Sequence, residues 1–290
     1  MFSIAFHGRR MSLAAGLLAA ASATSAAQSL AYVGGAQYAT GDFVFTQRTW
    51  SAYFSNGLAW SAGRVRASAG IPLVVQPGGW LQYSGAGTVV PTGGMTGSTG
   101  GSGNNPGATG SGTHGTAMTP PDGIPFSRVG IGDPIGRIEW TLTADAAHPI
   151  VSVVGAAKAP LADVNSGYGT GRWDVGAGLS GAMHVAGASV FADAVYWKLG
   201  NPPGASIHDA VVYAISVGRA LSLSPWTVVG TVSGASSLSA GVEAPLQAGM
   251  GVSYLLESGR SLLVTVGAGL TRTAPAFSTG LGWRIPLATE

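Results

Sequence analysis

Alternation of apolar residues with small or polar ones is the dominant pattern along the chain. It is clearest in the segment 173–185, which runs from Trp173 to Val185. The odd positions there carry Trp, Val, Ala, Leu, Gly, Met and Val, and the even positions carry Asp, Gly, Gly, Ser, Ala and His. A period of two predicts a β-strand. The polar face lacks the long charged residues of a soluble sheet, and an apolar outer face with a small polar inner face is typical of a transmembrane β-barrel strand.

The same alternation recurs along most of the chain and predicts about twelve strands. The other expected strands cover residues 32–42, 50–60, 65–75, 138–144, 150–157, 189–197, 210–217, 226–233, 246–254, 262–271 and 277–285. Short turns and longer loops join them alternately, so all the longer loops fall on the side opposite the termini. The fold class predicted is therefore all-β, a transmembrane antiparallel barrel of the outer membrane.

Aromatic residues lie near the ends of these expected strands. They are Trp50, Trp60, Trp173, Trp197, Trp226, Tyr254 and Phe277. Such residues form girdles at the two membrane interfaces of a barrel, so we expect their side chains to face outward.

Composition supports a membrane protein without a spanning helix. The chain is 46% hydrophobic and only 9% charged, against about 25% charged residues in soluble domains. No segment supplies the run of about 20 apolar residues that a spanning helix needs. Residues 13–23 are apolar, follow Arg9 and Arg10 and precede small residues, which predicts a secretory signal peptide over residues 1–27. Met11 is an alternative start. Residues 28–290 would then form the barrel of a Gram-negative outer membrane, with membrane lipids and the barrel assembly machinery as partners.

The charge balance argues against a nucleic-acid partner. Removing Arg9 and Arg10 from the fourteen basic residues leaves twelve, equal to the twelve acidic ones. A neutral chain without a basic cluster is not typical of nucleic-acid binding. The absence of cysteine excludes disulfides and Cys-ligated metals.

Residues 77–126 interrupt the strand pattern. The stretch is rich in Gly, Ser, Thr and Asn, and no charged residue occurs between positions 67 and 121. Such a composition buries too little apolar area to offset the entropy of ordering. We expect a flexible external loop. The alternative is a segment that folds into the lumen and gates it.

Charged residues on the inner faces of the strands are the candidates for lining the lumen. They are Arg66, Arg137, Glu139, Asp174, Asp193 and Arg284. Two readings stay open: they set the selectivity of a pore, or they pair across strands and plug it.

The connection between residues 158 and 174 brings further charges to one rim of the barrel. Lys158, Asp163, Arg172 and Asp174 lie around this loop. They would orient a polar group of a substrate, or Asp174 would pair with Arg172 or Lys158 and fix the loop to the rim.

Evidence for an enzyme is slight. His208 beside Asp209 is the one neighbouring pair suited to catalysis, and adjacency in sequence does not supply a relay geometry. No two histidines have metal-ligand spacing on one element. We therefore predict no catalytic residues, no metal and no cofactor. A barrel hydrolase remains the less favoured alternative.

Four short motifs occur in order at hairpin spacing. They are Gly130-x-Gly132-Asp133, Lys158-x-Pro160, Gly167-Tyr-Gly-Thr-Gly171-x-x-Asp174 and Gly200-Asn-Pro-Pro-Gly204. The chain thereby resembles the outer-membrane transporter family named for the MetA pathway of phenol degradation. It departs from that family at Leu161-Ala162, where Thr-Gly is commoner, and in lacking a terminal aromatic residue.

The resemblance implies a barrel that admits aromatic or other hydrophobic compounds. We accordingly predict a monomeric or weakly oligomeric outer-membrane channel for passive uptake of small hydrophobic or aromatic solutes. The alternative function is that of a structural or surface-exposed barrel with a closed lumen.

Overall fold

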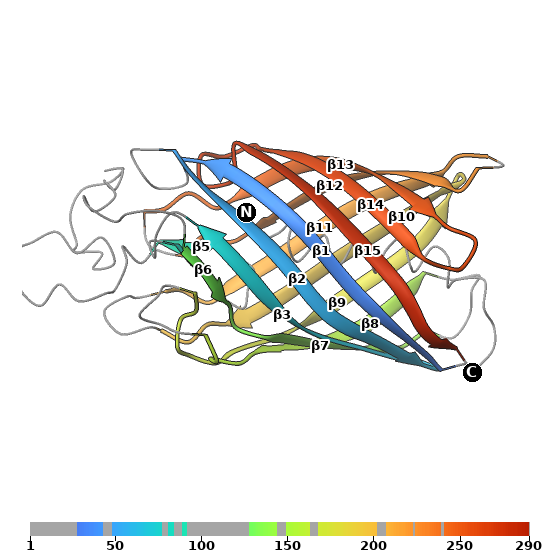
Figure 1. Cartoon of the computed structure of the whole chain (residues 1–290), viewed down its shortest axis with the longest axis horizontal. Coiled ribbons are helices and arrows are strands. Elements are labelled where there is room, and N and C mark those ends of the chain that lie inside the picture. The colour runs from blue at the N-terminus through green and yellow to red at the C-terminus, as the bar shows by residue number, and fades with distance from the viewer. Residues whose placement is uncertain are drawn as a thin grey trace, which may run out of the picture.

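The computed structural model describes residues 28–42, 48–76, 81–83, 89–91, 128–143, 149–162, 168–201, 207–222, 224–238 and 241–289. These residues form a closed antiparallel β-barrel of twelve strands (Figure 1), which confirms the predicted fold class. The barrel strands are β1 (Ser29–Gly41), β2 (Thr49–Ala62), β3 (Val65–Gln76), β7 (Ile135–Thr141), β8 (Ile150–Lys158), β9 (Asp174–Val185), β10 (Ala188–Lys198), β11 (Ala210–Ala220), β12 (Trp226–Ala235), β13 (Leu246–Leu255), β14 (Ser261–Gly269) and β15 (Phe277–Thr289). Because β1 pairs with both β2 and β15, the sheet closes on itself and leaves no open edge.

The described residues form three short strands in addition to these twelve, one of them in the barrel sheet. β6 (Arg128–Ile131) pairs with residues 73–76 at the end of β3, whereas β7 pairs with residues 65–70 of the same strand. β4 (Leu81–Tyr83) and β5 (Val89–Pro91) pair with each other and form a separate two-stranded sheet. They are the only parts of the predicted 77–126 loop that are described, and the rest of that loop lies outside the described residues.

Side chains alternate between the lumen and the outer surface as the sequence predicts. In β14 Leu262, Val264 and Val266 are 43%, 53% and 44% exposed, whereas Leu263 and Thr265 are buried. In a closed barrel the exposed set faces outward, where hydrocarbon replaces water as its surroundings. No helix among the described residues is long and apolar enough to cross a membrane.

The two ends of the barrel differ in the length of their connections. One end, here called the turn end, carries the two-residue turn 186–187 and the tight turn 63–64 (right in Figure 1). Ala186 and Gly187 have φ values of 50° and 77°, which suit the twist of a two-residue hairpin. The first and last strands also begin and end there. The loop end carries the longer connections, including 159–173 and 199–209.

Aromatic side chains mark both ends of the outer face. Trp50 stacks on Tyr38 near the loop end, with ring centroids 6.0 Å apart. Trp226 packs against Tyr254 at the turn end, with centroids 4.5 Å apart. This arrangement is typical of interfacial girdles. The prediction was wrong for Trp197, which is 0% exposed because the odd positions of β10 face the lumen.

The last strand is longer than predicted. β15 continues past Ile285 to Thr289, and Pro286 pairs with Ala31 beside a register shift in β1. A bulge tolerates proline because one ladder hydrogen bond is already missing there. The expected signal peptide, residues 1–27, lies outside the described residues.

Candidate functional site

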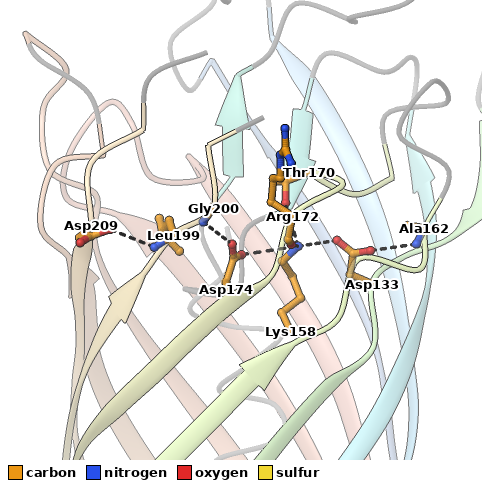
Figure 2. A network of polar contacts seen from close by, with 9 residues as sticks. All are labelled: Asp133, Lys158, Ala162, Thr170, Arg172, Asp174, Leu199, Gly200 and Asp209. Carbon is orange, nitrogen blue, oxygen red and sulfur yellow. Dashed lines mark hydrogen bonds and ion pairs between the residues drawn. The ribbon is translucent and has the colours of Figure 1, made fainter. Parts of the chain in front are cut away.

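A buried polar cluster lies where β8 ends and β9 begins, at the loop end of the barrel. Lys158, the last residue of β8, has a side chain that is 1% exposed. Its Nζ lies 2.5 Å from Oδ2 of Asp133 and 3.5 Å from Oδ2 of Asp174. It also donates hydrogen bonds to Oγ1 of Thr170 and to the carbonyl of Arg172, at 2.8 and 3.0 Å (Figure 2). We call Asp133, Lys158, Thr170 and Asp174 the Lys158 cluster.

The carboxylates of this cluster hold two loops onto the barrel. Oδ1 of Asp133 accepts a hydrogen bond from the backbone N–H of Ala162 at 2.9 Å. Oδ1 of Asp174 accepts one from the N–H of Gly200, also at 2.9 Å (Figure 2). Buried charges are stable only when paired and hydrogen-bonded, and each carboxylate here meets both conditions. The cluster therefore fixes the connections 159–173 and 199–209 to the strand ends.

Two glycines of the sequence motifs make room for the cluster. A Cβ on Gly169 would lie 2.5 Å from Oδ2 of Asp133. A Cβ on Gly130 would overlap the ring of Tyr168, which is 3% exposed. Glycine is needed at such positions because the backbone approaches a neighbouring group too closely for any side chain. The motifs thus converge on one structural unit.

The predicted rim residues do not all have the same role in the structure. Lys158 and Asp174 form an ion pair, as expected if these charges fix the loop to the rim. Asp174 was also predicted among the lumen residues; it is 0% exposed at an inward position of β9 and takes part in the Lys158 cluster. Arg172 contributes its carbonyl, while its exposed side chain points away from Lys158 (Figure 2). Asp163 lies outside the described residues.

A second charged cluster lies on the lumen side of β7 and β10. Nη2 of Arg137 is 2.6 Å from Oε1 of Glu139 and 2.6 Å from Oδ2 of Asp193. The three side chains are 8%, 9% and 12% exposed. One guanidinium between two carboxylates leaves a local charge of −1. These three predicted lumen residues, here called the Arg137 cluster, do come together across strands.

The remaining lumen candidates lie toward the turn end. Arg66 on β3 is directly opposite Glu139 in the β3–β7 register, so both side chains project to the same face. Arg284 on β15 is paired with Ser261 and Val33, close to where these strands meet the turn end. Both arginines are partly exposed. These two arginines add positive charge on the turn-end side of the Arg137 cluster.

A cluster of buried apolar side chains, here called the apolar layer, lies beside both charged clusters: Ile135 is paired with Lys158, and Val154 with Glu139, in the β7–β8 register. Along β7 the inward positions are Ile135 and then Arg137, and along β10 they are Asp193, Val195 and then Trp197. The inward side chains of this layer pack together and are all less than 9% exposed. They are Ile135, Val154, Val195, Trp197, Leu199, Ile207, Ala210, Val212, Ala235 and Leu238. Gly176 lies against the Trp197 indole, where a Cβ would be 2.8 Å from the ring.

Sequence reasoning missed the placement of three buried residues. Asp133 appears in a motif, but its role as the closest partner of Lys158 depends on loop closure over 25 positions. Trp197 is assigned to the outer girdle because it lies near a strand end, although the alternation along residues 189–197 places odd positions toward the lumen. Gln37 is an inward polar residue of β1, which the alternation of that strand would have revealed.

The His208–Asp209 pair does not form a relay. Oδ2 of Asp209 accepts a hydrogen bond from the hydroxyl of Tyr196 at 2.6 Å, and Oδ1 accepts one from the N–H of Leu199 at 3.0 Å. These two hydrogen bonds, the Tyr196 one foremost, lower the pKa of Asp209 from its usual value of 3.8. The carboxylate that His208 would need is thus already held by the barrel wall and the loop.

A closed antiparallel barrel with an apolar outer face and aromatic girdles is an integral protein of the outer membrane. No protein-family model matches the sequence, and no curated protein matches it. The fold is similar to that of the COG4313 outer membrane channel from Pseudomonas putida F1, with a TM-score of 0.56 and 12% identity over 89% of this chain and 95% of that one. The β domain of the Bordetella autotransporter BrkA matches with a TM-score of 0.44 and 13% identity over 90% and 99% of the two chains. The Pseudomonas putida toluene transporter TodX matches with a TM-score of 0.37 and 8% identity over 92% and 90%. The first of these similarities shows a shared fold.

Proposed function

We propose that this protein is an outer-membrane channel for passive uptake of small hydrophobic or aromatic compounds. The observation that carries the proposal is the buried apolar layer around Trp197, a residue at an inward position of β10. The lumen of a pore for polar solutes is itself polar. An indole surrounded by aliphatic side chains instead favours contact with another ring or an alkyl group. The fold shared with a bacterial outer-membrane channel and the resemblance to transporters linked to phenol degradation support the same function.

The mechanism we propose is facilitated diffusion without a cofactor. A solute enters at the loop end, crosses the apolar layer and then meets the Arg137 cluster and Arg66. The charged residues set a weak preference among ions and polar groups, and the apolar layer selects by hydrophobic contact. The Lys158 cluster keeps the loop-end connections in place, so that the entrance has a constant shape.

A barrel with a closed lumen is the second candidate. It is favoured by Trp197, which is 0% exposed, and by the ion pairs of Arg137, which tie β7 to β10 across the lumen. The two candidates predict different electrical behaviour. A channel conducts as the native protein, whereas a closed barrel conducts only after the apolar layer is reduced.

Planar-bilayer recording of the refolded protein separates the two. We expect small, discrete conductance steps from the native barrel and larger steps from Trp197→Ala, because the indole occupies the lumen. Trp60→Ala is the matched control: Trp60 is 39% exposed on the outer face, so its loss should leave the conductance unchanged. Silence of the native protein together with steps from Trp197→Ala would refute the channel and support the closed barrel.

A further inference from the structure

One side chain inside the barrel is buried without any hydrogen bond. Gln37, on β1, is 8% exposed, and neither its Nε2 nor its Oε1 has a partner among the described residues. A buried amide without partners is costly, because it has lost its hydrogen bonds to water and gained none in return. Native proteins rarely keep such a group unless water, an ion or a ligand supplies the missing partners.

The surroundings of Gln37 form a cavity in the lumen wall. The strand register aligns Tyr53, Gln37, Gly280 and Thr265 in one inward-facing row across β2, β1, β15 and β14. The cavity of about 20 Å³ is lined by these residues together with Gly35 and Leu263. This is space for one water-sized group, such as a hydroxyl.

Gly280 of this row and Gly35 of the next inward-facing row create the cavity. A Cβ on Gly280 would lie 2.9 Å from Oγ1 of Thr265 and 3.9 Å from Cγ of Gln37, so it would stand between them. A Cβ on Gly35 would lie 3.4 Å from Oγ of Ser55. The missing side chains leave a floor of bare backbone with the amide at one edge. The ring of Tyr53 and the side chain of Leu263 supply apolar walls.

This combination defines the ligand chemistry. The amide offers two N–H donors and one acceptor oxygen, and a hydroxyl or a carboxamide can accept from the nitrogen and donate to the oxygen. No charged residue is among the residues that line the cavity, so an ionised group would be left without a counter-ion. The apolar walls suit the carbon skeleton attached to the polar group.

We propose that Gln37 and its cavity form a binding subsite for neutral solutes that carry a hydroxyl or carboxamide on an apolar body. The inference rests on the proposed channel function, since a solute reaches the subsite through the lumen. It narrows the substrate class from hydrophobic compounds in general to those with one uncharged hydrogen-bonding group. Gln37 then makes the channel prefer such compounds over plain hydrocarbons of the same size.

The test compares two solutes that differ by one group. Benzyl alcohol and ethylbenzene have the same shape, but only the first has a hydroxyl. The side-chain amide signals of Gln37, identified by their loss in Gln37→Leu, are followed by NMR in the ¹⁵N-glutamine-labelled, micelle-refolded protein. We expect saturable shifts with benzyl alcohol and half-saturation at an about three- to tenfold lower concentration than with ethylbenzene, as one net hydrogen bond implies. Gln247→Leu removes another lumen amide away from the cavity and should change neither curve.

Equal responses to the two solutes, or no shift of the Gln37 signals, would overturn the subsite and indicate that a water molecule satisfies the amide. Gln37→Leu should fold at least as well as the native chain, because it removes an unpaired buried amide. The readout does not depend on conduction. Selective shifts in a barrel that passes no current would support the subsite while refuting the proposed channel, so the two failures are distinguishable.

Discussion

Lys158 and Asp133 form an ion pair whose side chains are only 1% and 2% exposed, with 2.5 Å between Nζ and Oδ2. Lys158 ends β8, and Asp133 lies between β6 and β7 on the neighbouring chain segment. Because Asp174 approaches the same ammonium, a single cation pairs with two carboxylates, one from the connection between β6 and β7 and one from the start of β9. The loop end of the barrel is therefore organised by one buried lysine.

Replacing Lys158 with methionine should destabilise the barrel strongly. The substitution leaves Asp133 and Asp174 buried without a cation, and breaking such a buried pair costs about 3–5 kcal/mol. Urea unfolding of the protein in lipid vesicles measures the change. The exposed Lys198 provides the control, since Lys198→Met should alter stability by less than about 1 kcal/mol. Equal effects of the two substitutions would mean that the cluster does not stabilise the fold.

Replacing Arg137 with glutamine should shift ion selectivity toward cations. The substitution changes the local charge of the Arg137 cluster from −1 to −2, because Glu139 and Asp193 remain. The reversal potential under a salt gradient reports this preference directly. Arg219 faces outward at the turn end of β11, so Arg219→Gln should leave the reversal potential as it is. An unchanged potential in Arg137→Gln would place the ion path away from this cluster.

Two glycines, one on β9 and one on β12, should respond oppositely to alanine. A Cβ on Gly178 would collide with the carbonyl oxygen of Ala194 on β10, so the two strands would have to separate. Overpacking of this kind costs about 1–3 kcal/mol. A Cβ on Gly230 meets nothing within 4 Å, and Gly230→Ala should stabilise the strand by about 0.5 kcal/mol. Unfolding midpoints of the two variants give the comparison, and a tolerated Gly178→Ala would contradict the β9–β10 packing.

Acid should release the 199–209 connection. The pKa of Asp209 is lowered by the Tyr196 hydroxyl and the Leu199 N–H, so this contribution to stability is complete above the usual value of 3.8 and is lost as the pH falls through the lower folded value. The protection factor of the Leu199 amide against hydrogen exchange, corrected for intrinsic rates, should fall in that range. Asp209→Asn should remove the pH dependence. Protection that stays constant in the native protein down to pH values well below 3.8 would disprove the assignment.

Much of the fold could be predicted from alternation alone. In β7, for example, the pattern assigned Ile138 and Trp140 to the outer face and Arg137 and Glu139 to the lumen, and their exposures agree. Period two is a local signal that depends only on which face meets lipid. The end of β15 was missed for a related reason: Pro286 breaks the local pattern, and the register shift that accommodates it lies in β1, far away in the sequence.

The candidate site was less accessible to sequence reasoning. Which carboxylate lies nearest to Lys158 depends on how three loops close over one strand end, and spacing along the chain does not specify this. Two features of Trp197 conflict: its nearness to a strand end favours an outer girdle, and its odd position in β10 favours the lumen. In the structure the side chain faces the lumen. The cavity beside Gln37 depends on Gly35 of the same strand, β1, and on Gly280 of β15, and these two strands become neighbours only when the barrel closes.

The most direct measurement is the flux of an aromatic solute through the protein. Vesicles with lipopolysaccharide in the outer leaflet and the phenol-oxidising enzyme tyrosinase inside report phenol entry as the formation of coloured quinone. We predict an initial rate that rises in proportion to the number of native barrels per vesicle, above the rate of protein-free vesicles. Trp60→Ala barrels should match the native rate. A rate equal to that of protein-free vesicles at every protein density would contradict the proposed channel.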